Sequence, residues 1–447
     1  MMRGDPEAVR SLTRGERRRA MTLSYVNAAL WAIGNGLVST TLVVYLALAR
    51  GADNLAVSLI VSAPHFAGLL RLAVPALMAW FAHRKALCIT AYVASAVVLC
   101  VVPIAASPRF SLGNAEVIST LVAAWCIYHL LEYAGTITLW SWLGDLAPRR
   151  IRGRFCGYRE RWLVAGRIGG IVFTIALAWL WGRVLPEGER WQPLAASAAI
   201  GAVLLAVSAV PLALMPAFEY MPSAVPRTPW RAVLRATFER PYRQLVVFSC
   251  YSSLVHGITA PAQGAYPRQM LGVSYSSMQM LQGMMRAGQT ALAPTMGKWC
   301  DLWGSRPVMI VSLLVSGVGP LFFIAATPDR WWWLIGAYVV WMAYAGLNVG
   351  FDNAKLKLAP PDNTAPYLAV YYALADFVFA VMTVASGLCI DWLVDAGHDR
   401  MHVYAGVFFI GFLGRMLGVP LVMAIDEPGA VRLRDWLARI WRRTRHA

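Results

Sequence analysis

The chain has few charged residues, and its cysteines form no recognisable pattern. Only 14% of its 447 residues are Asp, Glu, Lys or Arg, against roughly a quarter in an average soluble domain, which excludes most soluble architectures. The seven cysteines lie mainly in apolar runs and include no CxxC pair, so we expect neither a disulfide framework nor a zinc site. The sequence also lacks the phosphate-binding motif GxxxxGK[ST], which argues against ATP-driven pumping.

Two groups of residues have a spacing that metal ligands use. His129 and Glu132 are three residues apart, and His398 and His402 are four apart. The first group has no further ligands on a matching face, and the second lies in an outer loop with two acids, so both are weak as zinc sites. We therefore expect no metal, no cofactor and no enzymatic activity.

Hydrophobic residues make up 58% of the chain. A membrane-spanning helix needs about 20 largely apolar residues, and runs of that length recur along almost the whole sequence. We therefore predict an all-α integral membrane protein with twelve transmembrane helices. The predicted spans are 23–48, 57–81, 87–106, 116–143, 161–183, 193–217, 242–268, 276–299, 307–326, 332–356, 365–393 and 403–424.

Positive charge is sorted along the sequence. The 40 Lys and Arg residues outnumber the 23 Asp and Glu residues, for a net charge of +17. Most of the basic residues fall at the two ends and in alternate loops, and such residues mark the cytoplasmic side. This pattern predicts that both termini are cytoplasmic and that the chain is a multi-pass protein of the inner (plasma) membrane. Contact with anionic membrane lipids then explains the charge, and we expect no nucleic-acid partner.

The longest break between apolar runs divides six spans from six. A segment over residues 1–22 precedes a first bundle over 23–217, and a linker over 218–241 leads to a second bundle over 242–424. In the remaining tail, residues 425–447, tryptophan and leucine recur at helical spacing opposite arginine. This spacing predicts a basic amphipathic helix on the inner membrane surface.

Short sequence matches recur in the same order in the two bundles. A Leu-Ala-Pro triplet ends the fourth span at residues 146–148 and the tenth span at residues 358–360. Gly36 in the first span aligns with Gly257 in the seventh. Duplication of a six-span unit explains these matches, and transporters are often built from such repeats.

The loop after the eighth span contains a specific motif. Its sequence GKWCDLWGSRP, residues 297–307, places Gly297, Asp301, Gly304 and Arg306 at fixed spacing. This loop resembles the signature loop of the major facilitator superfamily, and the six-plus-six layout of the whole chain agrees. The resemblance implies two six-helix halves that rock about a site near the middle of the membrane.

The resemblance also implies a gate made by loop charges on the cytoplasmic side. When that side is closed, Asp301 would engage the start of the fifth span near Arg159 and Arg161, and Arg306 would contact Asp352. The alternative is that these are solvated charges that contribute little. The predicted gate residues are Asp145, which would pair with Arg152 or Arg154, together with Gly297, Asp301, Gly304, Arg306 and Asp352. The matching first-half loop, residues 79–85, lacks both the glycine and the aspartate.

Nine ionisable residues lie inside the predicted spans, where each is a candidate for function because burial in lipid is costly. They are His65, Arg71, His129, Glu132, Arg167, His256, Arg286, Asp376 and Arg415. Arg71 and Glu132 both lie roughly 15 Å from the inner ends of their spans, so they could pair. We predict that Glu132 or Asp376 transfers a coupling proton, with His129 as a possible partner of Glu132. Static ion pairs are the rival interpretation, which we favour for Arg415 because the twelfth helix of the superfamily is usually peripheral.

Polar side chains follow one face of several spans at helical spacing. The resemblance implies that the first, fourth, seventh and tenth helices line the central path, and all four have such a face. The predicted substrate-contacting residues are Asn27, Trp31, Asn35, Arg71, Tyr128, Glu132, His256, Gln263, Gln282, Arg286, Tyr344, Asn348 and Asp376. Hydrogen bonding between helices would explain any one of these faces alone.

The sequence thus predicts a monomeric secondary transporter that moves a small organic solute by alternating access. Arginines outnumber carboxylates inside the spans, which favours an anionic or zwitterionic solute, moved in symport with protons. Two alternatives stay open. One is a transporter of neutral sugars or amphiphilic compounds, including efflux, which aromatic residues near the path would favour. The other is a membrane receptor or scaffold that kept the fold without transporting.

Overall fold

The computed structural model describes residues 13–72, 84–107, 113–146, 152–184, 191–216, 238–239, 242–358 and 364–427. All secondary structure in these ranges is helical, which confirms the all-α prediction. The first half comprises α1 (Arg14–Leu37), α2 (Thr40–Ala49), α3 (Asn54–Gly68), η1 (Leu69–Leu72), α5 (Arg84–Leu99), α6 (Val101–Ala106), α7 (Asn114–Leu146), α8 (Arg152–Val184), α9 (Gln192–Val207) and α10 (Ala209–Leu214). The second half comprises α12 (Tyr242–Gln269), α13 (Tyr275–Trp303), α14 (Ser305–Gly317), α15 (Gly319–Ala325), η3 (Pro328–Arg330), α16 (Trp333–Val340), η4 (Trp341–Ala343), α17 (Tyr344–Leu358), α18 (Thr364–Asp395), α19 (Arg400–Leu417) and α20 (Val419–Met423).

Ten of the described helical segments are long and apolar enough to cross a membrane. The predicted second and eighth spans are outside that set. The second coincides in part with α3, a shorter apolar helix, and its end lies beyond the described residues. The eighth coincides with α13, which contains Gln279, Gln282 and Arg286. The chain is therefore a multi-pass helical membrane protein, while the count of twelve spans and the cytoplasmic termini stay predictions.

Four of the predicted spans are broken by proline. The second pieces of these spans, α6, α10, α15 and α20, contain Pro103, Pro211, Pro320 and Pro420 near their start. Proline has no N–H, so the carbonyl four residues earlier loses its helical partner. The preceding helix ends at that residue or one residue after it. The breaks fall in the third, sixth, ninth and twelfth predicted spans, and so recur at equivalent places in the two halves.

The first helix of each half crosses a long helix of the same half at a glycine. A Cβ on Gly36 of α1 would lie 2.6 Å from the carbonyl oxygen of Arg167 on α8. A Cβ on Gly257 of α12 would lie 2.7 Å from the carbonyl oxygen of Phe379 on α18. The two glycines that the sequence aligns therefore have the same packing role, because only glycine allows the backbones to approach this closely.

The same crossing predicts the effect of a single methyl group on α8. A Cβ on Gly170 would lie 2.4 Å from the carbonyl oxygen of Ile33, whereas Gly169 has no atom within 4 Å of that position. Gly170→Ala is expected to destabilise the protein by about 1–3 kcal/mol, as overpacking does. The control Gly169→Ala is expected to be neutral or slightly stabilising, since alanine favours helix. Thermal unfolding of the two purified variants tests this, and equal melting temperatures would contradict it.

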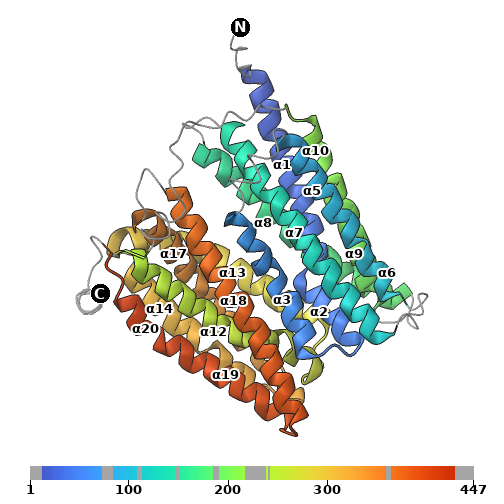
Figure 1. The fold of residues 1–447 in the computed structure, drawn as a ribbon, viewed down its shortest axis with the longest axis vertical. Helices are drawn as coiled ribbons and strands as arrows, with labels where there is room; N and C mark the ends of the chain where they lie inside the picture. The colour runs from blue at the N-terminus through green and yellow to red at the C-terminus, as the bar shows by residue number, and fades with distance from the viewer. Residues whose placement is uncertain are drawn as a thin grey trace, which may run out of the picture.

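The two halves lie side by side and meet along α3 and α18 (Figure 1). Helices α2 and α3 also pack against α12, and α8 packs against α13. The hydrogen bonds that the described residues form between the halves all involve first-half residues between Ser39 and His65. Along the long axis of the helices, these residues lie between the middle of the bundle and the turn that joins α2 to α3. We call this the far end, because it is opposite to the end where α1 begins.

Candidate functional site

A cavity of about 520 Å³ lies between the two halves. Helices α2 and α3 provide its first-half wall, and the second half provides the rest. Its lining includes Thr40, His65, His256, Gln263, Gln282, Arg286, Gln289, Tyr338, Trp341, Tyr344, Asn348, Phe379 and Arg415. Six of the predicted substrate-contacting residues are therefore in the lining: His256, Gln263, Gln282, Arg286, Tyr344 and Asn348. All six belong to the second half.

Two arginines give this cavity a positive charge that no lining carboxylate balances. Arg286 on α13 donates a hydrogen bond to Gln289, at 3.3 Å, which leaves most of its N–H groups without a partner among the described residues. Arg415 on α19 is only 2% exposed. Among the described residues the lining contains no Asp or Glu. The cavity therefore offers an anion the exposed guanidinium group of Arg286, and the charge of the buried Arg415 adds to the attraction.

Arg415 belongs to a chain of hydrogen bonds inside the second half. Its Nε donates to the Tyr344 hydroxyl at 3.2 Å, and that hydroxyl lies 2.7 Å from Nε2 of His256. Nδ1 of His256 lies 2.7 Å from the carbonyl oxygen of Ser252. Because that carbonyl can only accept, Nδ1 of His256 has the proton, and the Tyr344 hydroxyl donates to Nε2. The ion pair that we favoured for Arg415 is not formed with a described residue, because neutral groups hold its guanidinium. Its static role stays a prediction.

The break between α16 and α17 also shapes the cavity. The short η4 helix interrupts the tenth predicted span at Trp341, and this leaves backbone carbonyls without their usual helical donors. The side-chain amide of Gln289 donates to the carbonyl oxygen of Trp341, at 3.0 Å. Gln289 therefore stabilises the break that brings Trp341 and Tyr344 to the cavity wall.

A histidine–aspartate pair bridges the two halves beside the cavity. Nδ1 of His65 on α3 lies 2.9 Å from a carboxylate oxygen of Asp376 on α18. Gly68 permits this approach, since a Cβ there would lie 2.5 Å from the other oxygen of Asp376. The ring of His65 also lies against Phe379, with ring centroids 4.0 Å apart. Sequence reasoning found both ionisable residues but not their pairing, because nothing in a sequence states which helices of different halves meet.

The predicted first-half residues mostly lie inside that half instead of at the cavity. Asn27 is 1% exposed and donates to the carbonyl oxygen of Ser208. Asn35 donates to the hydroxyl of Tyr128, which is fully buried. Trp31 packs against the hydrophobic core. The hydrogen bonds of Asn27 and Asn35 join first-half helices, and none of these residues is in the lining of the central cavity. That the first and fourth spans line the path stays a prediction.

Glu132 also lies within the first half. It is 7% exposed, and one of its carboxylate oxygens accepts a hydrogen bond from Thr136 at 2.8 Å. The ring of His129, one turn earlier, packs edge-on against Trp125, and Nε2 of His129 has no hydrogen-bond partner among the described residues. The predicted pairing of Glu132 with Arg71 lies outside the described side chains.

The predicted gate is only partly formed. Gly304 has a positive φ of 89°, so the turn between α13 and α14 needs glycine at this position. The predicted contact of Arg306 with Asp352 is wrong, because Arg306 donates to the carbonyl oxygen of Ile425 and Asp352 pairs with Lys355 at 2.7 Å. This difference has a local cause, since Lys355 lies one turn from Asp352 on the same helix.

The other gate residues make no contacts between the halves that the structure describes. Asp301 is exposed, and it forms no ion pair with a described residue. A Cβ on Gly297 would meet no atom within 4 Å. The side chains of Asp145, Arg152 and Arg154 lie outside the described residues. The engagement of Asp301 with the fifth span, predicted for the state in which this side is closed, stays a prediction.

Glu427 has a structural role that sequence reasoning missed. Its buried carboxylate accepts hydrogen bonds from the backbone N–H groups of Ser305 and Arg306, and pairs with Lys357 at 3.0 Å. A carboxylate at a helix N-terminus is stabilised by the helix dipole. The residue thus joins the segment after α20 to the start of α14 and the end of α17.

Asp391 joins the two halves at the far end. Its carboxylate oxygens accept hydrogen bonds from the backbone N–H groups of Asn54 and Leu55, at 3.1 and 2.8 Å, where α3 begins. The side-chain amide of Asn54 donates to the same carboxylate at 2.7 Å, and the side-chain oxygen of Asn54 accepts from Tyr404, also at 2.7 Å. An acid near the end of the eleventh span was the available sequence signal, but its partner is 337 residues away in the chain.

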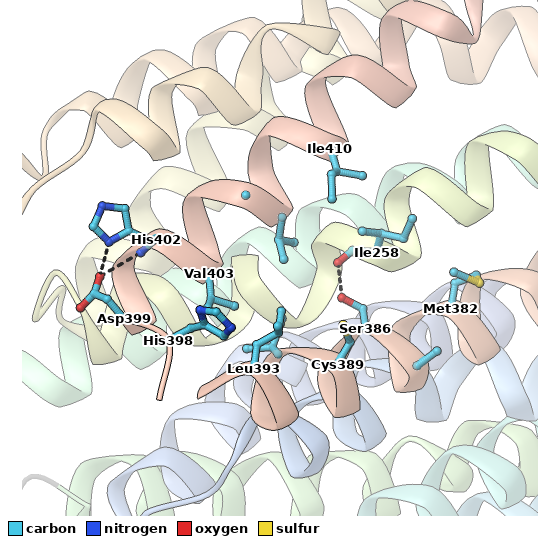
Figure 2. Close-up of a pocket in the computed structure, with 14 residues that line it drawn as sticks. Ile258, Met382, Ser386, Cys389, Leu393, His398, Asp399, His402, Val403 and Ile410 are labelled. Carbon is cyan, nitrogen blue, oxygen red and sulfur yellow. Dashed lines mark hydrogen bonds and ion pairs between the residues drawn. The ribbon is translucent and has the colours of Figure 1, made fainter. Parts of the chain in front are cut away.

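A second pocket, of about 700 Å³, lies between α18, α19 and α12 (Figure 2). Its wall is mostly apolar, and the polar residues His398, Asp399 and His402 lie at one end. Asp399 accepts a hydrogen bond from the backbone N–H of His402 at the start of α19, which lowers the pKa of Asp399. No group of three metal-ligating side chains occurs in the part of the chain that the structure describes. The wall of this second pocket is mostly apolar, whereas the smaller central cavity is lined by charged and polar side chains. The central cavity is therefore the better candidate for a solute site.

The fold, two helical halves with a charged cavity between them, is similar to that of known transporters. The family model described as Major Facilitator Superfamily matches residues 245–436, which confirms the resemblance seen in the 297–307 loop. No curated protein sequence matches the chain.

Solved structures resemble the chain over nearly its whole length. A mutant of the nucleoside transporter NupG matches with a TM-score of 0.65 at 15% identity, covering 92% of this chain and 100% of that one. A bacterial homologue of the human lysosomal transporter Spinster, inward-facing and unoccupied, matches with a TM-score of 0.61 at 14% identity, covering 93% and 95%. A bacterial metal transporter matches with a TM-score of 0.62 at 12% identity, covering 92% and 98%. At these identities the likeness establishes the fold, and both the family and these structures are transporters, not enzymes.

Proposed function

We propose that this chain is a secondary transporter for a small organic anion or zwitterion, which binds in the central cavity. The observation that supports the proposal is the pair of arginines, Arg286 and Arg415, in a lining whose described residues include no carboxylate. A mid-membrane arginine is costly unless it is paired or wetted. An anionic solute would pair with Arg286 and offset that cost, so the solute is stabilised where it is bound.

Alternating access explains how the solute would pass. Hydrogen bonds between the described parts of the two halves involve only the far-end part of the first half, up to His65. The other end has no such bonds between described residues, so the cavity would open there. With both termini in the cytoplasm and the chain in the inner membrane, as the charge pattern predicts, this is an inward-open state. A monomer is sufficient, because one chain provides both halves.

Proton coupling would use the pair of His65 and Asp376. The pair bridges the halves at 2.9 Å beside the cavity, so a proton gained or lost there changes the attraction between the halves. Glu132 and His129 stay candidates for the same role, but the Glu132 carboxylate faces Thr136 within the first half. A bridging pair can link protonation to movement more directly than a pair inside one half.

Asp376→Asn is expected to uncouple transport from the pH gradient. For one proton per solute, a gradient of one pH unit can drive about tenfold accumulation, and the variant is expected to lose this while still exchanging solute. Uptake of radiolabelled organic anions into proteoliposomes, with and without an imposed gradient, measures it. Asp395→Asn, near the exposed end of the same helix, is the control. If Glu132→Gln uncouples and Asp376→Asn does not, the proton moves through Glu132 instead.

A neutral sugar or amphiphile is the second candidate solute. The cavity wall includes the rings of Tyr338, Trp341, Tyr344 and Phe379, and such rings pack well against sugar and apolar surfaces. Competition for uptake distinguishes the two solute classes. Under our proposal, charged analogues compete and uncharged analogues of the same size do not.

A further inference from the structure

The central cavity adjoins a smaller cavity that lies further toward the far end. The smaller cavity has a volume of about 160 Å³. Val44 and Tyr45, further along α2 toward the turn that joins it to α3, line only the smaller cavity. Because some side chains face both spaces, a solute in the central cavity can extend into the smaller one. The lining residues that the two cavities share are Thr40, Val61, Gln263, Gln282 and Tyr338.

The lining of the smaller cavity is neutral. Its described residues include no Asp, Glu, Lys, Arg or His, in contrast to the arginines that line the central cavity. Its polar groups are hydroxyls and amides, which belong to Thr40, Thr41, Tyr45, Gln263, Gln282 and Tyr338. This end of the site therefore suits an uncharged polar group, and it offers no cation to a second anionic group.

Two polar groups on the shared wall are left to bind a solute. The hydroxyl of Thr40 has no hydrogen-bond partner among the described residues. The side-chain N–H of Gln263 donates to Thr259 at 3.0 Å, whereas its side-chain oxygen has no partner in the described part of the chain. Hydroxyl groups of a solute can satisfy both, since they donate and accept. A hydrocarbon tail would remove water from both groups without replacing its hydrogen bonds, which is unfavourable.

The charged and the neutral parts of the site are about one helical turn apart. Arg286 and Gln282 are four positions apart on α13, so they share a face and are separated by about 6 Å along the helix axis. The side-chain amide of Gln282 donates to the Thr41 hydroxyl at 3.0 Å, so Gln282 lies where α13 meets α2. An extended chain advances about 1.2 Å per bond, and about five bonds therefore cover the separation.

We propose that the smaller cavity is a second subsite for the same solute, and that the solute is a hydroxylated organic anion of about six carbons, such as a sugar acid. This inference rests on the proposed function and narrows its substrate class. The carboxylate of the solute binds Arg286, and hydroxyl groups near its other end bind Thr40 and Gln263. Thr40 belongs to the first half and the other two residues to the second, so the bound solute links the halves. An anion without hydroxyl groups cannot form that link.

Three six-carbon probes test the inference. Gluconate has a carboxylate and hydroxyl groups, hexanoate has only the carboxylate, and glucitol has only hydroxyl groups. Each is titrated calorimetrically into the purified wild type, Thr40→Val and Thr40→Ser. We expect the wild type to bind gluconate most tightly. Thr40→Val keeps the shape of the side chain but loses the hydroxyl, and it is expected to weaken gluconate binding about tenfold, equivalent to about 1.4 kcal/mol, while hexanoate binding stays unchanged.

Two further variants make that comparison specific to the hydroxyl. Thr40→Ser keeps the hydroxyl and is expected to bind gluconate with nearly the wild-type affinity. Thr90→Val is the matched control, because Thr90 is exposed on α5 and its hydroxyl donates within its own helix. This control is expected to bind all three probes as the wild type does.

The outcomes distinguish this inference from the proposed function. Gluconate binding that survives Thr40→Val, or hexanoate binding as tight as that of gluconate, would overturn the inference and leave the proposed function standing. Binding of glucitol but of neither acid would contradict the proposed function. Its sensitivity to Thr40→Val would then still decide whether the smaller cavity binds hydroxyl groups. Binding of none of the three would overturn the sugar-acid class, and the Arg286 variants would still decide whether the central cavity binds an anion.

Discussion

Arg286→Gln is expected to abolish uptake of the organic anion, with a loss of about a hundredfold or more in kcat/KM. The expectation follows from the cavity, because most N–H groups of Arg286, a cation of the lining, have no partner among the described residues. Removing one partner of a charge pair that is buried when the solute is bound costs about 2–5 kcal/mol. A free-energy cost of that size corresponds to the expected loss of about a hundredfold or more in kcat/KM. Arg286→Lys keeps the charge but loses the planar fork that binds a carboxylate in two places. We expect this variant to transport at an intermediate rate.

Initial uptake into proteoliposomes measures the effect of Arg286→Gln. Arg330→Gln is the control, because Arg330 is an exposed residue at the far end. Both variants are first shown to have the wild-type melting temperature, so that a lost rate is not lost fold. Uptake by Arg286→Gln within twofold of the wild type would mean that the cavity does not bind its solute through this residue.

Asp391→Asn is expected to open the far end. The carboxylate of Asp391 accepts three hydrogen bonds at the start of α3, and the helix dipole adds to their strength. An amide keeps the shape of the side chain but loses the charge and one acceptor. Hydrogen bonds to charged groups contribute about 1.5–3 kcal/mol, so we expect the closed-to-open ratio at this end to fall by about tenfold to a hundredfold.

Labelling of a buried position reports that opening. Ser58 is fully buried where α3 meets α18, and Ser58→Cys in a cysteine-free protein would react with a membrane-impermeant maleimide only when the far end opens. The reaction is expected to be at least about tenfold faster with Asp391→Asn, in proportion to the open population. Asp395→Asn, one turn further along α18, should leave the rate unchanged. Equal rates in all three proteins would show that Asp391 does not hold the far end closed.

The sequence predicted the helices well because bilayer thickness imposes one length on every span. Each predicted span coincides with a helix or a broken helix, except that the end of the second span lies outside the described residues. The breaks themselves were missed, although Pro103, Pro211, Pro320 and Pro420 were a readable signal, since proline removes a backbone donor wherever it stands.

The predicted residues that line the central cavity all come from the second half. Gln282, Arg286 and Tyr344 line the cavity, while Asn27 and Tyr128 form hydrogen bonds within their own bundle. Helical periodicity shows which residues share a face of a helix, but it does not show what that face packs against. The pairings of His65 with Asp376 and of Asn54 with Asp391 depend on how the halves meet, and local sequence contains no record of that.

The central claim is that the cavity binds an organic anion through Arg286. A thermal-shift screen of metabolites on the purified protein, run in parallel on wild type, Arg286→Gln and Arg330→Gln and at several pH values, tests it most directly, because a bound ligand raises the melting temperature. We predict that the stabilising compounds are organic anions, and that Arg286→Gln loses their effect while Arg330→Gln keeps it. Stabilisation by neutral sugars alone, or by anions equally in all three proteins, would contradict the claim.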